Sequence, residues 1–204
     1  MNESQSTDRR RARSERTRSK LLDAAIECYT RNGIAATGMD EVAQQAGVGR
    51  ATLYRHFNNQ ESLLLDVMAH NLRRIRDAVL ESIRNCERTE DLYVEAAISI
   101  LRETRERGLT TLLFGEDATS RTVNRITFSD PVIKRMGEEM LTPFLNQARR
   151  EGVLRDWVTK PLLLEWTSRV MLSFIATPSE RLDSPVKLRR FFHQAIIPSI
   201  IDRS

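Results

Sequence analysis

The stretch TGMDEVAQQAGVGRATLYRHFNNQESLL, residues 37–64, decides how the rest of the chain is interpreted. Met39, Val42, Ala43 and Ala46 follow one another at the spacing i, i+3, i+4, i+7, which puts them on one face of a two-turn helix. Gly47 comes directly after them, where a sharp turn favours a residue that can adopt positive φ. The pattern predicts two short helices joined by a tight turn, followed by the start of a third.

The second short helix has one apolar face and one polar, basic face. Leu53 and Phe57 lie at i and i+4, so they can pack inward together. The residues left on its outer face are Arg50, Ala51, Thr52, Tyr54 and Arg55. A small basic face on a short helix held by a turn fits the major groove of DNA. An ordinary corner between two helices, with a solvated polar face, is the alternative for this pattern alone.

Longer helices are expected on both sides of this stretch. A first helix should begin near Ser14, and it carries an apolar stripe across residues 22–29. Asn32-Gly33 is a typical helix end. A long helix should follow the turn at residues 58–59, with Asn59 as its N-cap.

The segment in front of the first helix is strongly basic. The 204-residue chain has a formal net charge of +4, so the position of its bases matters more than their total. Residues 1–13 have nothing to bury, which predicts a disordered arm. Its arginines are Arg9, Arg10, Arg11 and Arg13. Such an arm can reach phosphates or the minor groove, and a tail that only improves solubility is an equally good interpretation.

Several classes of chemistry have no motif in this sequence. Cys28 and Cys86 belong to no C-x-x-C pair or His/Cys cluster, which argues against a metal site or disulfide framework. The three histidines are scattered, and no phosphate-binding loop, G-x-S-x-G or H-E-x-x-H string occurs. No apolar run has the length of a membrane span, and the N-terminus lacks the apolar core of a secretory signal. We therefore expect a cytoplasmic protein that is not an enzyme and needs no cofactor, metal or membrane.

The rest of the chain also has a helical pattern. Asp130-Pro131 is a clear start, with an N-cap followed by proline at the first helical position. The helix that begins there should run to Gly152 and be kinked by Pro143. Because no strand-type alternation of apolar and polar residues appears, the sequence predicts an all-helical body.

The last two helices, opened by Pro161 and by Ser184-Pro185, are apolar around more than half of their circumference. A terminal helix with two apolar faces needs a second partner, which predicts a dimer interface made by both helices and their copies. The residues assigned to this interface are Leu163, Trp166, Val170, Phe174, Leu188, Phe191, Phe192, Ala195 and Ile196. A helical hairpin buried in a monomer is the alternative.

Residues 18–65 resemble the N-terminal domain of the TetR-type (TetR/AcrR) family of bacterial transcriptional regulators. The matching positions are Ala24, Ala25, Tyr29, Gly33, Thr37, Val42-Ala43, Ala46-Gly47-Val48, Thr52-Leu53-Tyr54-Arg55-His56-Phe57 and Glu61-Ser62-Leu63-Leu64. So many residue types at fixed spacing make this resemblance specific. Residues 66–204 are similar to the family only in helical style, length and apolar final helices.

The resemblance implies an all-α fold with three regions: a basic arm (1–13), a three-helix DNA-binding domain with a helix-turn-helix (14–65), and a helical effector-binding and dimerisation domain (66–204). It also implies a homodimer that binds a palindromic operator on double-stranded DNA and represses transcription. A small, largely apolar effector would release it. Two alternatives remain: a regulator without a small-molecule effector, controlled by abundance or a protein partner, and, remotely, an enzyme.

The family pattern assigns DNA-contacting roles to particular positions. Thr37, Thr52, Tyr54 and His56 match phosphate-contacting and positioning residues, and Arg50, Ala51 and Arg55 match positions that approach bases. Arg50 is the best candidate for reading a base, because arginine can donate two hydrogen bonds to guanine.

Three positions depart from the family pattern: Gly38 and Gly49 replace hydroxyl-bearing caps, and Gln60 replaces a lysine. The interface therefore lacks two side-chain donors and one charge toward phosphate. The hypothesis is that the arginine arm replaces them.

An effector pocket is expected between the long helix after Asn59 and the helix after Asp130. Its candidate wall residues are His70, Arg74, Phe114, Arg125, Phe128, Met140, Phe144 and Trp166. Plain core packing is the alternative for each apolar member. The mixture favours an apolar ligand with one acidic or polar group.

Overall fold

The computed structural model describes residues 2–106 and 130–203, and every regular element in these two ranges is a helix. A single β-bridge joins Leu154 and Ile201 within the same ranges. The described residues form two compact units, an N-terminal unit of residues 2–71 and a C-terminal unit of residues 72–106 and 130–203. The predicted all-α class is confirmed. In the part of the chain described here, no helix is long and apolar enough to cross a membrane.

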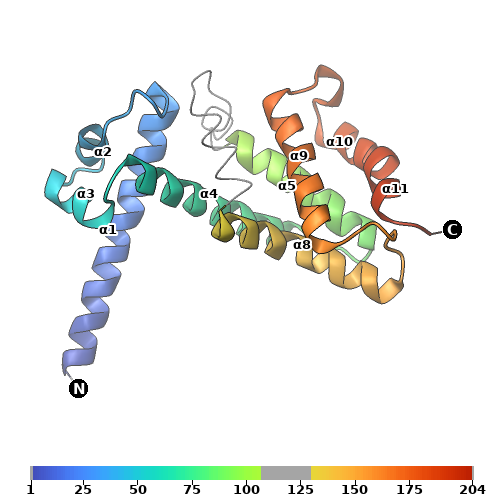
Figure 1. Cartoon of the computed structure of the whole chain (residues 1–204), viewed down its shortest axis with the longest axis horizontal. Helices are drawn as coiled ribbons and strands as arrows, with labels where there is room; N and C mark the ends of the chain where they lie inside the picture. Colours follow the sequence, from blue (N-terminus) through green and yellow to red (C-terminus); the bar gives the residue numbers. More distant parts are fainter. Residues whose placement is uncertain (1, 107–129, 204) are drawn as a thin grey trace. The chain divides into compact units, whose positions relative to one another are not determined.

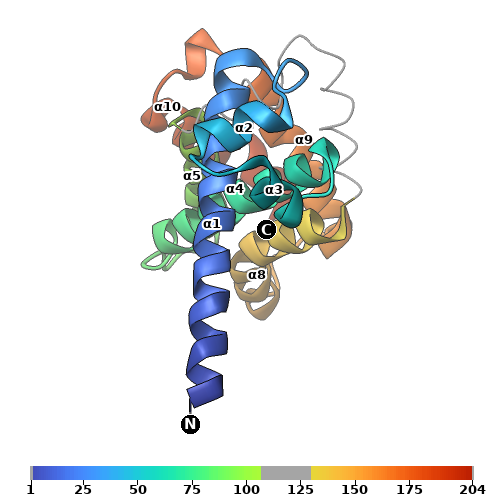
Figure 2. The ribbon, with the colours of Figure 1, turned by 90° about the vertical axis from the view of Figure 1, so that its left-hand side faces the viewer.

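The N-terminal unit holds α1 (Asn2–Asn32), α2 (Met39–Gln45), α3 (Arg50–His56) and the first turns of α4 (Gln60–Ser82). Figure 2 shows α2 and α3 lying beside the C-terminal half of α1, while its N-terminal turns continue past them. The unit's largest buried side chains are Leu21, Tyr29, Leu53, Phe57 and Leu63, each at most 1% exposed. They come from α1, from α3 and its end, and from α4, and α2 adds the buried Val42 and Ala43, so one core fixes the position of α3.

Two glycines make the sharp turns that the sequence predicts. Gly33 follows α1 with φ of 80°, and Gly47 lies between α2 and α3 with φ of 66°. This left-handed conformation is costly for any residue with a Cβ atom. Asn59 caps α4 as expected, since its Oδ1 accepts a hydrogen bond of 2.8 Å from the Ser62 N–H.

The basic arm is helical, and the prediction of disorder for residues 1–13 is wrong on this point. α1 begins at Asn2 rather than near Ser14. The segment contains neither proline nor glycine, and it extends a helix that is already formed, so it avoids the cost of nucleation. Side chains 6–16 are exposed, so this part of the helix forms without burying a face.

The C-terminal unit is built on α5 (Thr89–Glu106), against which α8 (Pro131–Glu151) and α9 (Lys160–Ala176) pack (Figure 1). Asp130 caps α8 as predicted, accepting hydrogen bonds from the N–H groups of Val132 and Ile133. Gly152 ends that helix with φ of 67°. The helix continues through Pro143, and the kink expected there stays a prediction.

The chain ends in a helix interrupted near Pro198. A 3₁₀ turn (Glu180–Leu182) precedes α10 (Pro185–Phe191), a π-helical turn (Phe192–Ile196) and α11 (Ile197–Ile200). Proline has no N–H to donate and its ring crowds the preceding turn, so the wider turn in front of Pro198 is expected physically. Ser184 caps α10, as the sequence predicts.

Candidate nucleic-acid interface

Helix α3 is held by its apolar side and by its backbone, with no side-chain cap. Gly49 is the N-cap residue, and its carbonyl oxygen accepts hydrogen bonds from the N–H groups of Thr52 (2.8 Å) and Leu53 (3.3 Å). Leu53 is fully buried, and Phe57 follows the helix at 1% exposure. The absence of a capping side chain at Gly38 and Gly49 is thereby confirmed.

The outer face of α3 carries the residues predicted for DNA contact. Arg50, Ala51, Tyr54 and Arg55 are exposed, and Thr52 and His56 are half-buried. This single turn-and-a-half of helix thus presents two guanidinium groups and a phenol to solvent.

Arg50 is already oriented in the free protein. Its guanidinium lies 5.5 Å from the centre of the Tyr54 ring, and its Nη1 lies 2.9 Å from Asp40 Oδ2. Both members of the Arg50–Asp40 pair are more than half exposed, and such pairs contribute about 0–1 kcal/mol. Exchanging Asp40 for a base edge or a phosphate therefore costs little, while Tyr54 limits where the guanidinium can point.

His56 differs from the arginines around it because its charge is suppressed. Partial burial, and then the positive charges of Arg55 and Arg18, lower the pKa of its imidazole from the ordinary value of 6.5. The ring is neutral at pH 7 and offers one N–H donor. A hydrogen bond, not a salt link, is the contact it can make with phosphate.

Thr37 and Gln60 are used inside the N-terminal unit. Thr37 is 2% exposed, and its hydroxyl donates to the Gly33 carbonyl oxygen at 2.8 Å. The Gln60 side-chain amide donates to the carbonyl oxygens of Ile34 and Thr37, both at 2.9 Å. These bonds tie the α1–α2 connection to the start of α4, so both side chains hold the helices in position. Their contacts with DNA stay a prediction.

The helical arm distributes its arginines around the helix. Arg9, Arg13 and Arg16 recur at i, i+4, i+7 and share one face, while Arg11 and Arg18 are seven residues apart on another. The Arg18 guanidinium donates to Asp66 and lies 5.2 Å from the centre of the Phe57 ring, so it is engaged within the unit. The arginines predicted for DNA contact cannot all face one surface.

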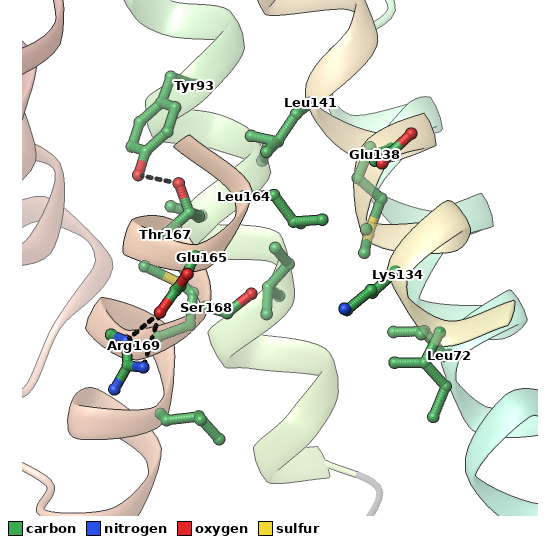
Figure 3. A pocket seen from close by; sticks show the side chains of 18 of the residues that line it. Leu72, Tyr93, Lys134, Glu138, Leu141, Leu164, Glu165, Thr167, Ser168 and Arg169 are labelled. Atoms are coloured by element: carbon green, nitrogen blue, oxygen red, sulfur yellow. Dashed lines mark hydrogen bonds and ion pairs between the residues drawn. The ribbon is translucent and has the colours of Figure 1, made fainter. Parts of the chain in front are cut away.

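The C-terminal unit encloses a cavity of about 400 Å³ between α5, α8 and α9, with Leu72 of α4 at its edge (Figure 3). Most of its lining is apolar, and Met140 is the one predicted pocket residue that lines it within the described ranges. The residues that sequence reasoning missed include Ala96, Lys134, Leu141, Leu164 and Ser168. Gly137 was the available signal, because a Cβ atom there would lie 2.6 Å from Leu164 Cδ1 at the cavity wall.

The other predicted pocket residues lie elsewhere. His70 Nε2 lies 3.4 Å from Asp23 Oδ1 in the N-terminal unit. The ring centres of Phe144 and Tyr93 are 5.4 Å apart, and those of Trp166 and Trp157 are 6.1 Å apart. Phe144 and Trp166 therefore pack against other aromatic rings and do not line the cavity. Arg74 is exposed and does not line the cavity. Phe114, Arg125 and Phe128 lie outside the described residues.

The predicted dimer interface divides into two groups. Leu163, Leu188, Phe192 and Ile196 are buried within the protomer, so they have little surface left for a second copy. Helix periodicity alone cannot show which apolar face meets the same chain, and the assignment of these four residues to a dimer interface stays a prediction. The residues still partly or fully exposed are Trp166, Val170, Phe174, Phe191 and Ala195. Phe174 and Phe191 are 5.8 Å apart and form one aromatic surface across α9 and α10.

The sequence of this chain is similar to those of known bacterial regulators. A family model described as bacterial regulatory proteins of the tetR family matches residues 21–67. The chain is 30% identical over 152 residues to YhgD, a helix-turn-helix transcriptional regulator of Bacillus subtilis (strain 168), with 74% of this chain and 76% of YhgD covered. It is 23% identical over 168 residues to the regulator UidR of Escherichia coli (strain K12), covering 81% of each.

Solved structures share the fold. FadR of Bacillus halodurans, a fatty acid degradation regulator, superposes with a TM-score of 0.68 at 13% identity, covering 88% of this chain and 95% of FadR. A TetR family regulator of Marinobacter aquaeolei VT8 superposes with a TM-score of 0.67 at 21% identity, covering 96% and 100%. With a helix-turn-helix in place and one relative matched across about three quarters of both chains, the protein belongs to the TetR family of bacterial transcriptional regulators, which bind DNA and are not enzymes.

Proposed function

We propose that this regulator is a cytoplasmic homodimeric repressor that binds a palindromic operator and leaves it when a small, largely apolar ligand enters the C-terminal unit. The DNA-binding part rests most directly on α3, whose exposed face holds Arg50 against Tyr54. A guanidinium with restricted motion is suited to a two-bond contact with guanine.

The dimer is supported by the apolar surface that remains on α9 and α10. Leu162, with 48% of its surface exposed, lies on α9 together with half-buried Trp166 and Val170. Large exposed apolar patches of this kind mark association surfaces. A second copy of the same surface is the partner that gives two α3 helices, as a palindrome requires.

The effector is supported by the cavity. A volume of about 400 Å³ falls within the usual range for small-molecule sites, and its lining is mostly apolar with a few polar groups. Control by abundance or by a partner protein is the competing function, and it gives the cavity no role.

Selection of bound duplexes from random DNA tests the proposal. We expect a palindrome whose half-sites are centred about 10–10.5 base pairs apart or a multiple of that spacing. Arg50→Lys separates the charge of Arg50 from its geometry, because lysine keeps the charge but cannot make the two-bond contact with guanine. This variant should weaken the base preference at one position in each half-site. A single asymmetric site would contradict the dimer, and no enriched site would contradict operator recognition.

A further inference from the structure

The cavity of the C-terminal unit has an uneven distribution of charge. Its charged lining residues are Lys134, Glu138, Glu165 and Arg169. Glu138 Oε2 lies 2.7 Å from the ammonium of Lys160, and Glu165 Oε1 lies 2.7 Å from Arg169 Nη2. Both carboxylates are therefore neutralised by a neighbouring base.

Lys134 is different. Its ammonium makes no hydrogen bond or ion pair with any residue in the described ranges, although Arg135, the next residue, pairs with Glu139 at 3.6 Å. Figure 3 shows the Lys134 ammonium and the Ser168 hydroxyl pointing toward one another across the cavity. The Lys134 ammonium and the Ser168 hydroxyl thus face the same space, and both can still donate a hydrogen bond to a ligand.

Among the residues that the structure describes, the deeper wall of the cavity has no comparable free group. The Tyr93 and Thr167 hydroxyls are hydrogen-bonded to each other at 2.9 Å, and the two residues are buried. Ala96, Ala97, Leu141 and Met171 supply apolar surface nearby. A ligand in this cavity meets hydrocarbon inside and a cation at one side.

We propose that the cavity binds an amphipathic organic anion, with its carboxylate on Lys134 and Ser168 and its apolar body against α5, α8 and α9. This inference rests on the proposed ligand-binding role of the C-terminal unit and specifies the chemical class of the ligand. The carboxylate gains a charge-assisted hydrogen bond from Lys134 and a second hydrogen bond from Ser168. A neutral or cationic ligand of the same body gains less or is repelled.

The test measures binding of matched probes to the full-length protein without DNA, by isothermal titration calorimetry below the concentration at which micelles form. The probes are octanoate, octan-1-ol and octylammonium, and the flat analogues 1-naphthoate and 1-naphthalenemethanol. We expect each carboxylate to bind about tenfold more tightly than its alcohol. Equal affinities, or no carboxylate binding tighter than about 1 mM, would overturn the proposal.

Four variants separate the effect of charge from the effect of cavity volume. Lys134→Met should remove the preference for carboxylates, and Lys134→Glu should shift it toward octylammonium. Arg135→Met removes the same charge one residue away and should change nothing. Ser168→Trp fills the cavity and should weaken all probes alike; if carboxylate binding survives it, the anion binds elsewhere and the proposal fails.

The same probes are then added to the protein–DNA complex. Carboxylate binding without loss of DNA would keep this inference and contradict only the proposed release mechanism. Loss of DNA binding on adding all three octyl probes equally would keep an effector role and contradict the anion preference.

Discussion

Helices α3 and α9 each bury one face in their own unit, but the exposed face of α3 is basic and that of α9 is apolar. On α3, Leu53 is buried while Arg50 and Arg55 are exposed. On α9, Leu163 is buried, yet Leu162 and Val170 keep apolar surface in contact with solvent. A helix with one apolar face has all the apolar partners it needs, whereas a helix with two still lacks one.

The two outer faces favour different kinds of partner, a charged one for α3 and an apolar one for α9. A basic outer face loses little by staying in water until it meets phosphate, and its affinity then depends on salt. An apolar outer face is unfavourable in water at all times, so it favours permanent association. Substitutions on each face should therefore affect different measurements.

The largest effect is expected on α9. Val170→Glu would place an unpaired carboxylate in the proposed dimer interface, at a cost on the order of 3–5 kcal/mol. Sedimentation equilibrium should show a dimer for the natural chain and a monomer for the variant at the same concentration. Asn146→Glu adds the same charge at an exposed position of α8 and should leave the dimer intact. A dimeric Val170→Glu protein would place the interface elsewhere.

On α3, Arg50→Ala should cost about 1–3 kcal/mol on the selected operator and relax the preference at one base pair in each half-site. Fluorescence anisotropy with operator and random duplexes measures both effects. The oligomeric state should not change, which distinguishes this face from that of α9. Equal losses on both duplexes would make Arg50 a phosphate contact instead.

The two units also differ in how far sequence could predict them. The turns at Gly33 and Gly47, the cap at Asn59 and the packing of Leu53 against its neighbours depend on residues close in the chain, and all were predicted. The hydrogen bonds of Gln60 join it to residues 26 and 23 positions earlier, beyond the reach of any local pattern. Its positioning role was missed for that reason, and its contact with DNA stays a prediction.

The cavity shows the same limit more strongly. Ala96, Lys134 and Leu164 come from three helices that are far apart in sequence, and nothing local marks them as neighbours. Phe144 and Trp166 were predicted to line the effector pocket because they are large and aromatic. Large side chains fill cores more often than they line cavities. Small residues were the better sign of the cavity wall: Ala96 and Gly137 line it, and Gly137 lets Leu164 approach closely.

The arm allows a finer test of the basic side of the comparison. Because it is helical, at most about two of Arg9, Arg10, Arg11 and Arg13 should meet the same DNA surface. We compare Arg9→Gln/Arg13→Gln with Arg10→Gln/Arg11→Gln, since glutamine keeps the helix while removing charge. One pair should lower the log–log salt slope of DNA binding by about 0.9–1.8, and the other should leave it unchanged. Equal changes would contradict a single contacting face, and no change would remove the arm from the interface.

The smallest effect concerns ion pairs at the end of the C-terminal unit. There Arg203 Nη2 lies 3.0 Å from Glu151 Oε2, and the Thr89 hydroxyl and the Gln147 amide donate to Glu151 Oε1 at 2.6 Å and 3.1 Å. Hydrogen bonds from Thr89 and Gln147, together with the Arg203 charge, lower the pKa of the Glu151 carboxyl from its ordinary 4.5.

A carboxyl whose pKa is lowered by folding stabilises the folded state above its unfolded pKa, and this contribution disappears as the pH falls through the folded value. Glu151→Gln should therefore lower the urea midpoint near neutral pH, and its curve should meet that of the natural chain once the pH has fallen below the lowered pKa of Glu151. Glu81→Gln, which removes an exposed carboxylate from α4, controls for the loss of one charge. Parallel curves for Glu151→Gln and the natural chain would mean that Glu151 acts through packing. Converging curves would show that the C-terminal unit, beyond its apolar surface, also depends on a charge held in place by its neighbours.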